Sequence, residues 1–203
     1  MKACRITIRA PVGSLISFHG VYQPVPSAPF PSTIEGILKR LFDGFEGKFA
    51  YDFEKQGILR TYDVEVSRRN PAKPGRKLLR YVELYNHPTV NIYVGKKYCE
   101  KKMVNSVHLF NPTYPADIVR REVELVRIEE YNGEVRTAGV VLQVAVNNSF
   151  VLGYSKFEYL GDYHRREVEK RVAYYVLSNV QKEALEKTNA YVDVERRKAV
   201  VFL

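Results

Sequence analysis

The chain has 203 residues, of which 45% are hydrophobic, so it can bury a core as one large domain or two small ones. It shows no apolar signal region, and its longest apolar stretch, residues 138–146, is far shorter than the roughly 20 residues that cross a bilayer. These features argue against a membrane-spanning helix and predict a soluble, cytoplasmic protein with no membrane partner.

The net charge of +9 is concentrated in one part of the chain. Residues 67–102 carry ten basic and two acidic side chains, whereas the residues from 103 onwards carry 14 of each sign. A clustered basic excess produces a local positive potential that attracts polyanions, which makes nucleic acid the first partner to consider. The alternative is a solvated basic loop with no specific partner. The ten basic residues are Arg68, Arg69, Lys73, Arg76, Lys77, Arg80, Lys96, Lys97, Lys101 and Lys102.

The sequence contains none of the common catalytic or metal-binding motifs. No P-loop, HExxH or GxSxG motif is present. Cys4 and Cys99 form no CxxC pair and predict no disulfide framework. We therefore expect no metal, no cofactor and no enzymatic activity. The histidines are too widely spaced for a zinc site; they are His19, His87, His108 and His164.

The N-terminal residues predict a strand, a long loop and a helix. Residues 3–9 alternate between apolar and polar side chains, which indicates a strand with one buried face. Residues 10–31 contain five prolines and two glycines and predict an irregular loop, and loops of this length are usually functional. A helix follows, because Ser32 and Glu35 have the capping-box spacing and the apolar residues of 34–42 recur at helical spacing.

The central part of the chain predicts three strands, over 58–67, 78–86 and 89–94. The breaker at 70–75 separates the first two strands, and His87-Pro88 separates the last two. Residues after 94 are irregular as far as 117 and carry the second part of the basic cluster.

The C-terminal half predicts two hairpins and a second helix. Residues 122–131 and 134–146 are joined by Asn132-Gly133, a pair that favours a tight hairpin turn. Residues 162–187 carry a narrow apolar stripe and predict a helix. Residues 190–203 predict a hairpin or paired strands, with the turn at 195–197.

This order of elements predicts an α+β fold in which a helix packs on an antiparallel sheet. Strand, helix, strand, strand is the opening of a ferredoxin-like (RRM-like) fold, which serves RNA-binding domains and enzymes alike. We predict a βαββ-type N-terminal domain over 1–118 that contains a basic hairpin or thumb insertion. The remainder, 119–203, is predicted to be a smaller C-terminal region of hairpin, helix and strands packed on that domain.

Three segments near the N-terminus resemble one protein family. They are the strand Cys4–Arg9, the loop Ser17-Phe18-His19-Gly20 and the block 30–38, which reads FPSTIEGIL. They are similar to the repeat-associated RNA-binding (RAMP) superfamily of CRISPR systems and, within it, to the fifth Cas family. Residues 80–84, 90–94 and 152–156 are similar to the family more loosely. Gly36 costs about 0.8–1 kcal/mol relative to alanine in a helix, and a close backbone approach would explain its presence.

The chain departs from the family pattern at two places. It has Gly36-Ile37-Leu38 where the family has a Gly-Leu-Leu-like core, and no clear Leu-Gly-Arg-Glu string is present. The subtype within the family is therefore open.

The resemblance implies a subunit at one end of a multi-subunit, RNA-guided surveillance complex of the Cascade type. Such subunits hold the 5′ handle of the CRISPR RNA (crRNA), dock to backbone and large subunits, and meet target DNA only indirectly. In the family, a basic thumb hairpin projects from the N-terminal domain and clamps the RNA, and residues 67–102 lie where this hairpin would be. Besides the ten basic residues, the predicted RNA-binding residues are Phe18, His19 and Tyr22 of the loop and Lys39 of the helix.

Two other functions stay open at this point. One subtype of the family cuts precursor crRNA without a metal, which requires a base for the 2′-hydroxyl and a cation for the phosphate. His19 and Tyr22 on the loop, or His87 near Lys96 and Lys97, are the candidates for such a metal-independent endoribonuclease. The other alternative is a protein-interaction subunit with no RNA contact, whose basic segment meets an acidic protein partner.

Overall fold

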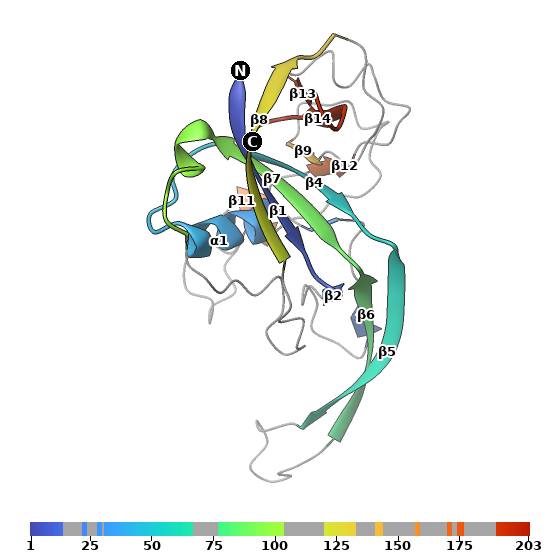
Figure 1. Ribbon diagram of the computed structural model, residues 1–203. Helices are drawn as coiled ribbons and strands as arrows, with labels where there is room; N and C mark the ends of the chain where they lie inside the picture. The colour runs from blue at the N-terminus through green and yellow to red at the C-terminus, as the bar shows by residue number, and fades with distance from the viewer. Residues whose placement is uncertain are drawn as a thin grey trace.

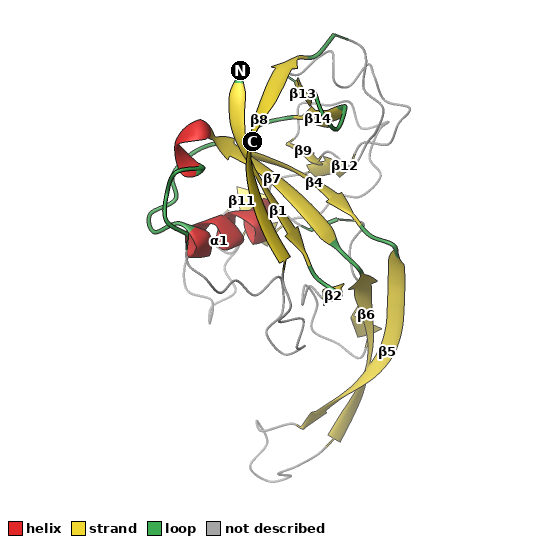
Figure 2. Ribbon diagram, in the orientation of Figure 1, coloured by secondary structure: helices red, strands yellow, loops and turns green. Residues whose placement is uncertain are grey.

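Strands dominate the computed structural model (Figure 2). The structure describes residues 1–13, 22–23, 28–29, 31–66, 77–103, 120–132, 141–143, 157–158, 170–171, 174–176 and 190–203. Within these ranges the chain forms fourteen strands, one α-helix, α1 (Pro31–Leu41), and one 3-10 helix, η1 (Lys96–Tyr98).

The largest sheet has six strands, all antiparallel, in the order β14-β13-β8-β1-β7-β4 (Figure 1). Their bounds are β1 Lys2–Arg9, β4 Phe49–Glu54, β7 Thr89–Gly95, β8 Arg120–Glu130, β13 Tyr191–Asp193 and β14 Lys198–Val200. A second sheet contains β2 (Val12–Gly13), β3 (Tyr22–Gln23), β5 (Gly57–Val66) and β6 (Lys77–Asn86). Two short pairs complete the set, β9 (Val141–Gln143) with β12 (Tyr174–Val176) and β10 (Phe157–Glu158) with β11 (Lys170–Arg171).

The two edges of the six-stranded sheet meet each other. Just beyond β14, the backbone N–H of Leu203 donates to the carbonyl of Phe49 at the start of β4, at 2.8 Å. At the other end of the same strands, Lys198 lies 3.6 Å from Asp52 and also contacts Glu54. The sheet is therefore bent into a nearly closed, barrel-like form. Its own C-terminal strands, β13 and β14, cover the inner face.

The predicted ferredoxin-like α+β fold is wrong. The described residues are mostly strand, with a nearly closed six-stranded antiparallel sheet and one α-helix. The alternation in 3–9 correctly indicated a strand but not its surroundings, because both of its faces are buried from Ala3 to Ile8. The polar residues Arg5 and Thr7 face the enclosed interior, where other side chains satisfy them. A polar strand face indicates solvent only when nothing covers it.

Two predictions for the C-terminal half are also wrong. Lys170–Arg171 and Tyr174–Val176 lie in strands within the predicted helix 162–187. Valine recurs in this segment, and β-branched side chains favour strands once a partner strand is available. The predicted pairing of 122–131 with 134–146 is wrong where the structure describes it, because β8 pairs with β1 and β13 and β9 pairs with β12. Gly133 and the rest of the second segment lie outside the described residues.

The C-terminal hairpin is confirmed. Tyr191 pairs with Val200 and Asp193 with Lys198, and a four-residue turn joins the two strands. The carboxylate of Asp193 accepts from the backbone N–H groups of Glu195 and Arg196 at 3.1 and 3.2 Å. This side chain therefore holds the turn that returns the chain toward β4.

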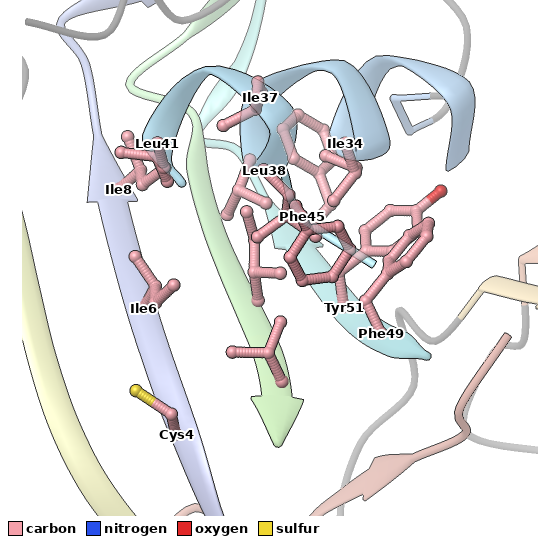
Figure 3. Packing of buried hydrophobic residues seen from close by; sticks show 14 of the residues in the cluster. Cys4, Ile6, Ile8, Ile34, Ile37, Leu38, Leu41, Phe45, Phe49 and Tyr51 are labelled. Carbon is pink, nitrogen blue, oxygen red and sulfur yellow. The ribbon is translucent and has the colours of Figure 1, made fainter. Parts of the chain in front are cut away.

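The helix and its apolar stripe are confirmed, and they form the core on the outer face of the sheet. The helix begins at Pro31, one residue before Ser32, a position at which the fixed φ of proline suits a helix. Gly44, with φ +64°, follows its end. In Figure 3 the helical side chains lie against the strands; the labelled residues are Ile34, Ile37, Leu38 and Leu41 of α1, Cys4, Ile6 and Ile8 of β1, Phe45, and Phe49 and Tyr51 of β4.

Gly36 has no close neighbour, so the expected close backbone approach is wrong. A Cβ added at this position meets no atom within 4 Å. Alanine reduces the freedom of the unfolded chain and suits a helix better than glycine. We expect Gly36→Ala to raise the free energy of unfolding by about 0.8–1 kcal/mol in urea denaturation. A lower stability in this variant would show that the site is more crowded than the structure indicates.

The inner face of the sheet combines a small apolar core with buried charges. Ala3, Ala50, Val126, Ile128 and Val200 pack around Tyr93. The Tyr93 hydroxyl lies 3.0 Å from a carboxylate oxygen of Asp193 and 3.0 Å from a nitrogen of Arg196. Burial, reinforced by the charge of Asp52, raises the pKa of Tyr93, so this hydroxyl stays protonated.

Each buried ion on this face has a partner of opposite charge. Arg5 contacts Asp193 at 2.7 Å, and Arg196 contacts Asp52 at 2.5 Å. Buried charges are tolerated when they are paired and hydrogen-bonded in this way. The cluster links β1, β4, β7 and the C-terminal hairpin, and so holds the sheet in its closed form.

Cys4 and Cys99 form a disulfide, so the expectation of two unlinked cysteines is wrong. Their Cα atoms are 5.2 Å apart although 95 positions separate them in sequence. The antiparallel pairing of β1 with β7 sets Cys4 opposite Val94, and η1 then turns Cys99 back toward Cys4. Cysteine spacing alone does not reveal such a contact, because it depends on which strands pair.

Candidate nucleic-acid interface

A long hairpin projects from the body of the molecule (Figure 1). It consists of β5 and β6, paired in antiparallel register from Gly57–Asn86 to Val66–Lys77. Residues 67–76 join the two distal ends and contain four of the predicted RNA-binding residues. These residues lie outside the described part of the chain; they are Arg68, Arg69, Lys73 and Arg76. The hairpin thus places Lys77 and Arg80 on the strand that leaves this basic loop.

One face of the hairpin exposes large apolar side chains. Tyr62 is 65% exposed and Leu79 is 57% exposed, both well above the level usual for core residues. The rings of Tyr62 and Tyr81 lie directly across the two strands, with centroids 5.4 Å apart in an edge-to-face arrangement. Ile58, nearer the body, is also exposed. The hairpin therefore exposes the ring of Tyr62 to solvent, with the half-buried ring of Tyr81 against it.

The loop that follows β1 comes back to this hairpin. Its strand β3 pairs with β6 in parallel, and the register sets Tyr22 opposite Tyr81. Tyr62, Tyr81 and Tyr22 thus occupy one row across β5, β6 and β3. Two segments predicted separately to contact RNA, the loop and the basic hairpin, are neighbours in the fold. Phe18 and His19 of the same loop lie outside the described residues.

The base of the hairpin is fixed to the body. The N–H of Gln56 donates to the carbonyl of Asn86, and the N–H of His87 donates to that of Pro11, both at 2.9 Å. The Lys55 ammonium lies 5.1 Å from the ring centre of Tyr85. Burial lowers the pKa of Lys55, and the charge of Glu83 acts in the opposite direction. The hairpin is thus anchored at its base by backbone bonds and by a partly buried cation.

The structure divides the basic stretch 67–102 into two groups. Lys96, Lys97, Lys101 and Lys102 are exposed in and after η1, at the end of β7 opposite the hairpin. At about 3.3 Å per residue, the seven residues of β7 span about 20 Å and the ten of β6 about 30 Å. Figure 1 shows η1 and the hairpin at opposite sides of the molecule. One small ligand therefore does not contact both groups.

Two further predicted residues lie apart from the hairpin face. His87 is exposed at the bend between β6 and β7, where its φ is +46° and its Nδ1 lies 2.8 Å from Oδ1 of Asn86. Because the length of β7 separates it from Lys96 and Lys97, these three side chains do not form one catalytic group. Lys39 is exposed on α1 and paired with Glu35 at 2.7 Å.

Tyr62 and Tyr81 were missed by the sequence reasoning. The signal that would have found them is their position in two strands of equal length joined by a basic loop, because such a hairpin pairs residues equidistant from the loop. The exposure of Tyr62 depends on what the hairpin packs against, which a one-dimensional pattern does not report.

In the described part of the chain, no group of three or more His, Cys, Asp or Glu side chains is placed to bind a metal ion. No helix among those residues has both the length and the apolar character needed to span a bilayer. No protein-family model matches the chain, and no curated protein matches its sequence.

Proposed function

We propose that this protein is a non-catalytic RNA-binding subunit of a cytoplasmic CRISPR surveillance complex of the Cascade type, in which it holds the 5′ handle of the crRNA. The observation that carries the proposal is the projecting β5–β6 hairpin, which combines the exposed Tyr62, packed against Tyr81, with a loop that is basic in sequence. The similarity of residues 4–38 to the fifth Cas family supports the same role. The bound handle, the backbone and large subunits, and indirectly the target DNA are the proposed partners.

The chemistry of the hairpin suits unpaired RNA. Exposed aromatic rings stack on bases, and each such contact contributes about 1–3 kcal/mol to single-strand binding. Lys77, Arg80 and the loop arginines supply the cations that phosphates require. A hairpin that stands clear of the body can also reach around a strand and contact a neighbouring subunit through Leu79 and Ile58.

Sequencing the RNA that copurifies with the protein tests the proposal first. The protein is purified from its own host at moderate salt, and the bound nucleic acid is extracted and sequenced. We expect short RNAs that share a common 5′ end. Heterogeneous RNA, or none, would contradict the handle-binding role and favour binding of an acidic protein instead.

Binding measurements then test the hairpin itself. With about five phosphate contacts, the logarithm of the affinity for the handle RNA should fall against log salt with a slope of about −3.5. Tyr62→Ala should weaken binding by about 5- to 150-fold, because it removes a stacking surface, whereas Tyr62→Phe should retain it. Leu125→Ala, a change at an exposed apolar residue of β8, serves as the control. Equal affinity of all three variants in fluorescence anisotropy would overturn the assignment.

The endoribonuclease alternative keeps His19 and Tyr22 as its candidates. It predicts cleavage of precursor RNA that survives EDTA, fails on a 2′-deoxy substrate and disappears in His19→Ala. The separation of His87 from Lys96 and Lys97 leaves that second candidate group without its cations. Cleavage lost in His87→Ala but kept in His19→Ala would contradict this view of the site.

A further inference from the structure

Four exposed lysines lie in and just after η1, and we call them the lysine platform (Lys96, Lys97, Lys101 and Lys102). Between them, the buried ring of Tyr98 lies 5.1 Å from the ammonium of Lys97 and 5.1 Å from that of Lys101. The Tyr98 hydroxyl donates to the carbonyl of Glu46 at 2.6 Å. Two of the four cations are thus positioned over an aromatic ring that is itself fixed in the core.

Two more contacts hold the platform in place. Tyr98 packs against Phe42 and Phe45, with ring centroids 5.0 and 4.9 Å apart. Cys99, between the two lysine pairs, is joined to Cys4 of β1 by the disulfide. The platform is therefore anchored both to the helical core and to the central strand of the sheet, so little ordering entropy is lost when it binds a ligand.

The charge of the platform is not neutralised within the described structure. None of its lysines forms an ion pair with a described residue, whereas Lys39, Arg60 and Lys198 all do. Glu100 is the one acid within 96–102, which leaves this segment an excess of three positive charges. Four exposed ammonium groups within seven residues therefore present a compact cationic surface.

The platform differs from the hairpin in one respect that selects its ligand. The hairpin exposes the ring of Tyr62, on which an unpaired base can stack. At the platform the only ring among the lysines, Tyr98, is buried, and the described residues there offer no stacking surface. A surface of cations without exposed rings binds anionic groups such as phosphates and offers nothing on which a base can stack. That chemistry fits a duplex, whose bases are stacked inside and whose backbone carries a high density of phosphate.

We propose that the lysine platform is a second nucleic-acid site, which binds the phosphate backbone of duplex DNA independently of sequence. This inference rests on the proposed function, because it assigns the single-stranded RNA to the hairpin. The two sites lie at opposite ends of the ribbon formed by β4–β7 and β5–β6, so they bind their ligands at the same time.

A paired set of variants tests the platform. The probe is a 12-base-pair DNA duplex, measured by fluorescence anisotropy at 50 and 200 mM salt. With four phosphate contacts, the affinity of the native protein should fall by about 150-fold between the two salt concentrations. The variant Lys96→Gln/Lys97→Gln/Lys101→Gln/Lys102→Gln should lose nearly all of this salt dependence. The control neutralises four basic residues of β1 and β8 instead, as Lys2→Gln/Arg9→Gln/Arg121→Gln/Arg127→Gln, and should bind the duplex as the native protein does.

The same variants separate this inference from the proposed function. Tyr62→Ala should weaken binding of the single-stranded handle RNA and leave duplex binding unchanged, and the platform variant should do the opposite. Duplex binding that the platform and control variants weaken equally would overturn the platform and leave the hairpin assignment intact. Duplex binding that depends on sequence, or single-stranded RNA binding lost in the platform variant alone, would also overturn it. Thermal melts confirm that all variants are folded.

Discussion

Replacing Asp193 with alanine is expected to lower the free energy of unfolding by about 3–5 kcal/mol, because it removes the buried carboxylate that pairs with the buried guanidinium of Arg5, whose other partners, Glu124 and Glu195, are exposed. Asp193 is fully buried, and one of its carboxylate oxygens lies 2.7 Å from a guanidinium nitrogen of Arg5. The same oxygen accepts from Tyr93 at 3.0 Å. Arg5 is itself buried and remains charged at every accessible pH, so the cost is not relieved by loss of a proton.

The position of Asp193 adds a second effect to the loss of the ion pair. Its other carboxylate oxygen accepts from two backbone N–H groups in the turn between β13 and β14. Without these bonds the turn is less well held, and the C-terminal segment that reaches β4 is released more easily. Asp193→Asn should therefore cost less than Asp193→Ala, since the amide oxygen can still accept in the turn while the charge is lost.

Urea denaturation measures this effect, with Glu195→Ala as the matched control. Glu195 also contacts Arg5, at 3.2 Å, but its side chain is 66% exposed. Exposed ion pairs contribute about 0–1 kcal/mol, so this variant should be close to the native protein. A loss in Asp193→Ala no larger than that in Glu195→Ala would contradict the buried cluster as the element that holds the sheet closed.

The elements that local patterns determine were predicted well. The alternation in β1 and the 3.6-residue spacing in α1 are properties of a few consecutive residues, and the structure confirms both. The long strands β5 and β6 and the C-terminal hairpin were also found near their predicted positions. In each case the residues that define the element are close together in the sequence.

The closure of the sheet could not be predicted in this way. It depends on Leu203 meeting Phe49 and on Arg196 meeting Asp52, pairs that lie far apart in the sequence. Nothing in the polar alternation of β1 indicates that Arg5 faces a buried carboxylate rather than water. The predicted partner of β8 was wrong for the same reason, because β8 pairs with β1 and β13, which lie far from it in the sequence.

The candidate site was predicted in composition but not in geometry. The charge distribution located the basic residues of 67–102 but gave no distances between them. Two groups that β7 separates were therefore treated as one surface. Tyr22 lies beside β6 because β3 pairs with β6 in parallel. The proline-rich sequence of the loop does not indicate this pairing. Tyr62 is exposed because the hairpin projects from the body, and the sequence does not indicate this projection.

Reduction of the Cys4–Cys99 disulfide is expected to cost about 2–5 kcal/mol of stability. The bond closes a segment of the chain with a sequence separation of 95, and in the chain-entropy model a loop of about 100 residues gives about 4.7 kcal/mol. Cys4 is fully buried in the outer core, where a thiol packs as a small apolar group, so reduction leaves the packing largely intact. The loss therefore comes mainly from the greater freedom of the unfolded chain.

Thermal melts with and without a phosphine reductant measure this cost. For a chain of this length each kcal/mol lowers Tm by about 2–4 °C, so reduction should lower Tm by roughly 4–20 °C. Cys4→Ala/Cys99→Ala should melt near the reduced protein and should not respond to the reductant. Two free thiols per chain in the denatured, unreduced protein would show that the bond does not form.

The disulfide also links stability to the lysine platform. Cys99 lies between the two lysine pairs, so the reduced protein holds these cations less firmly. We therefore expect reduction to weaken duplex binding while handle binding at the distant hairpin stays unchanged. Disulfides persist in oxidising compartments and in the cytosol of hyperthermophiles, and are rare in other reducing cytosols. The thiol count of protein isolated from its own host therefore shows whether the bond is closed there.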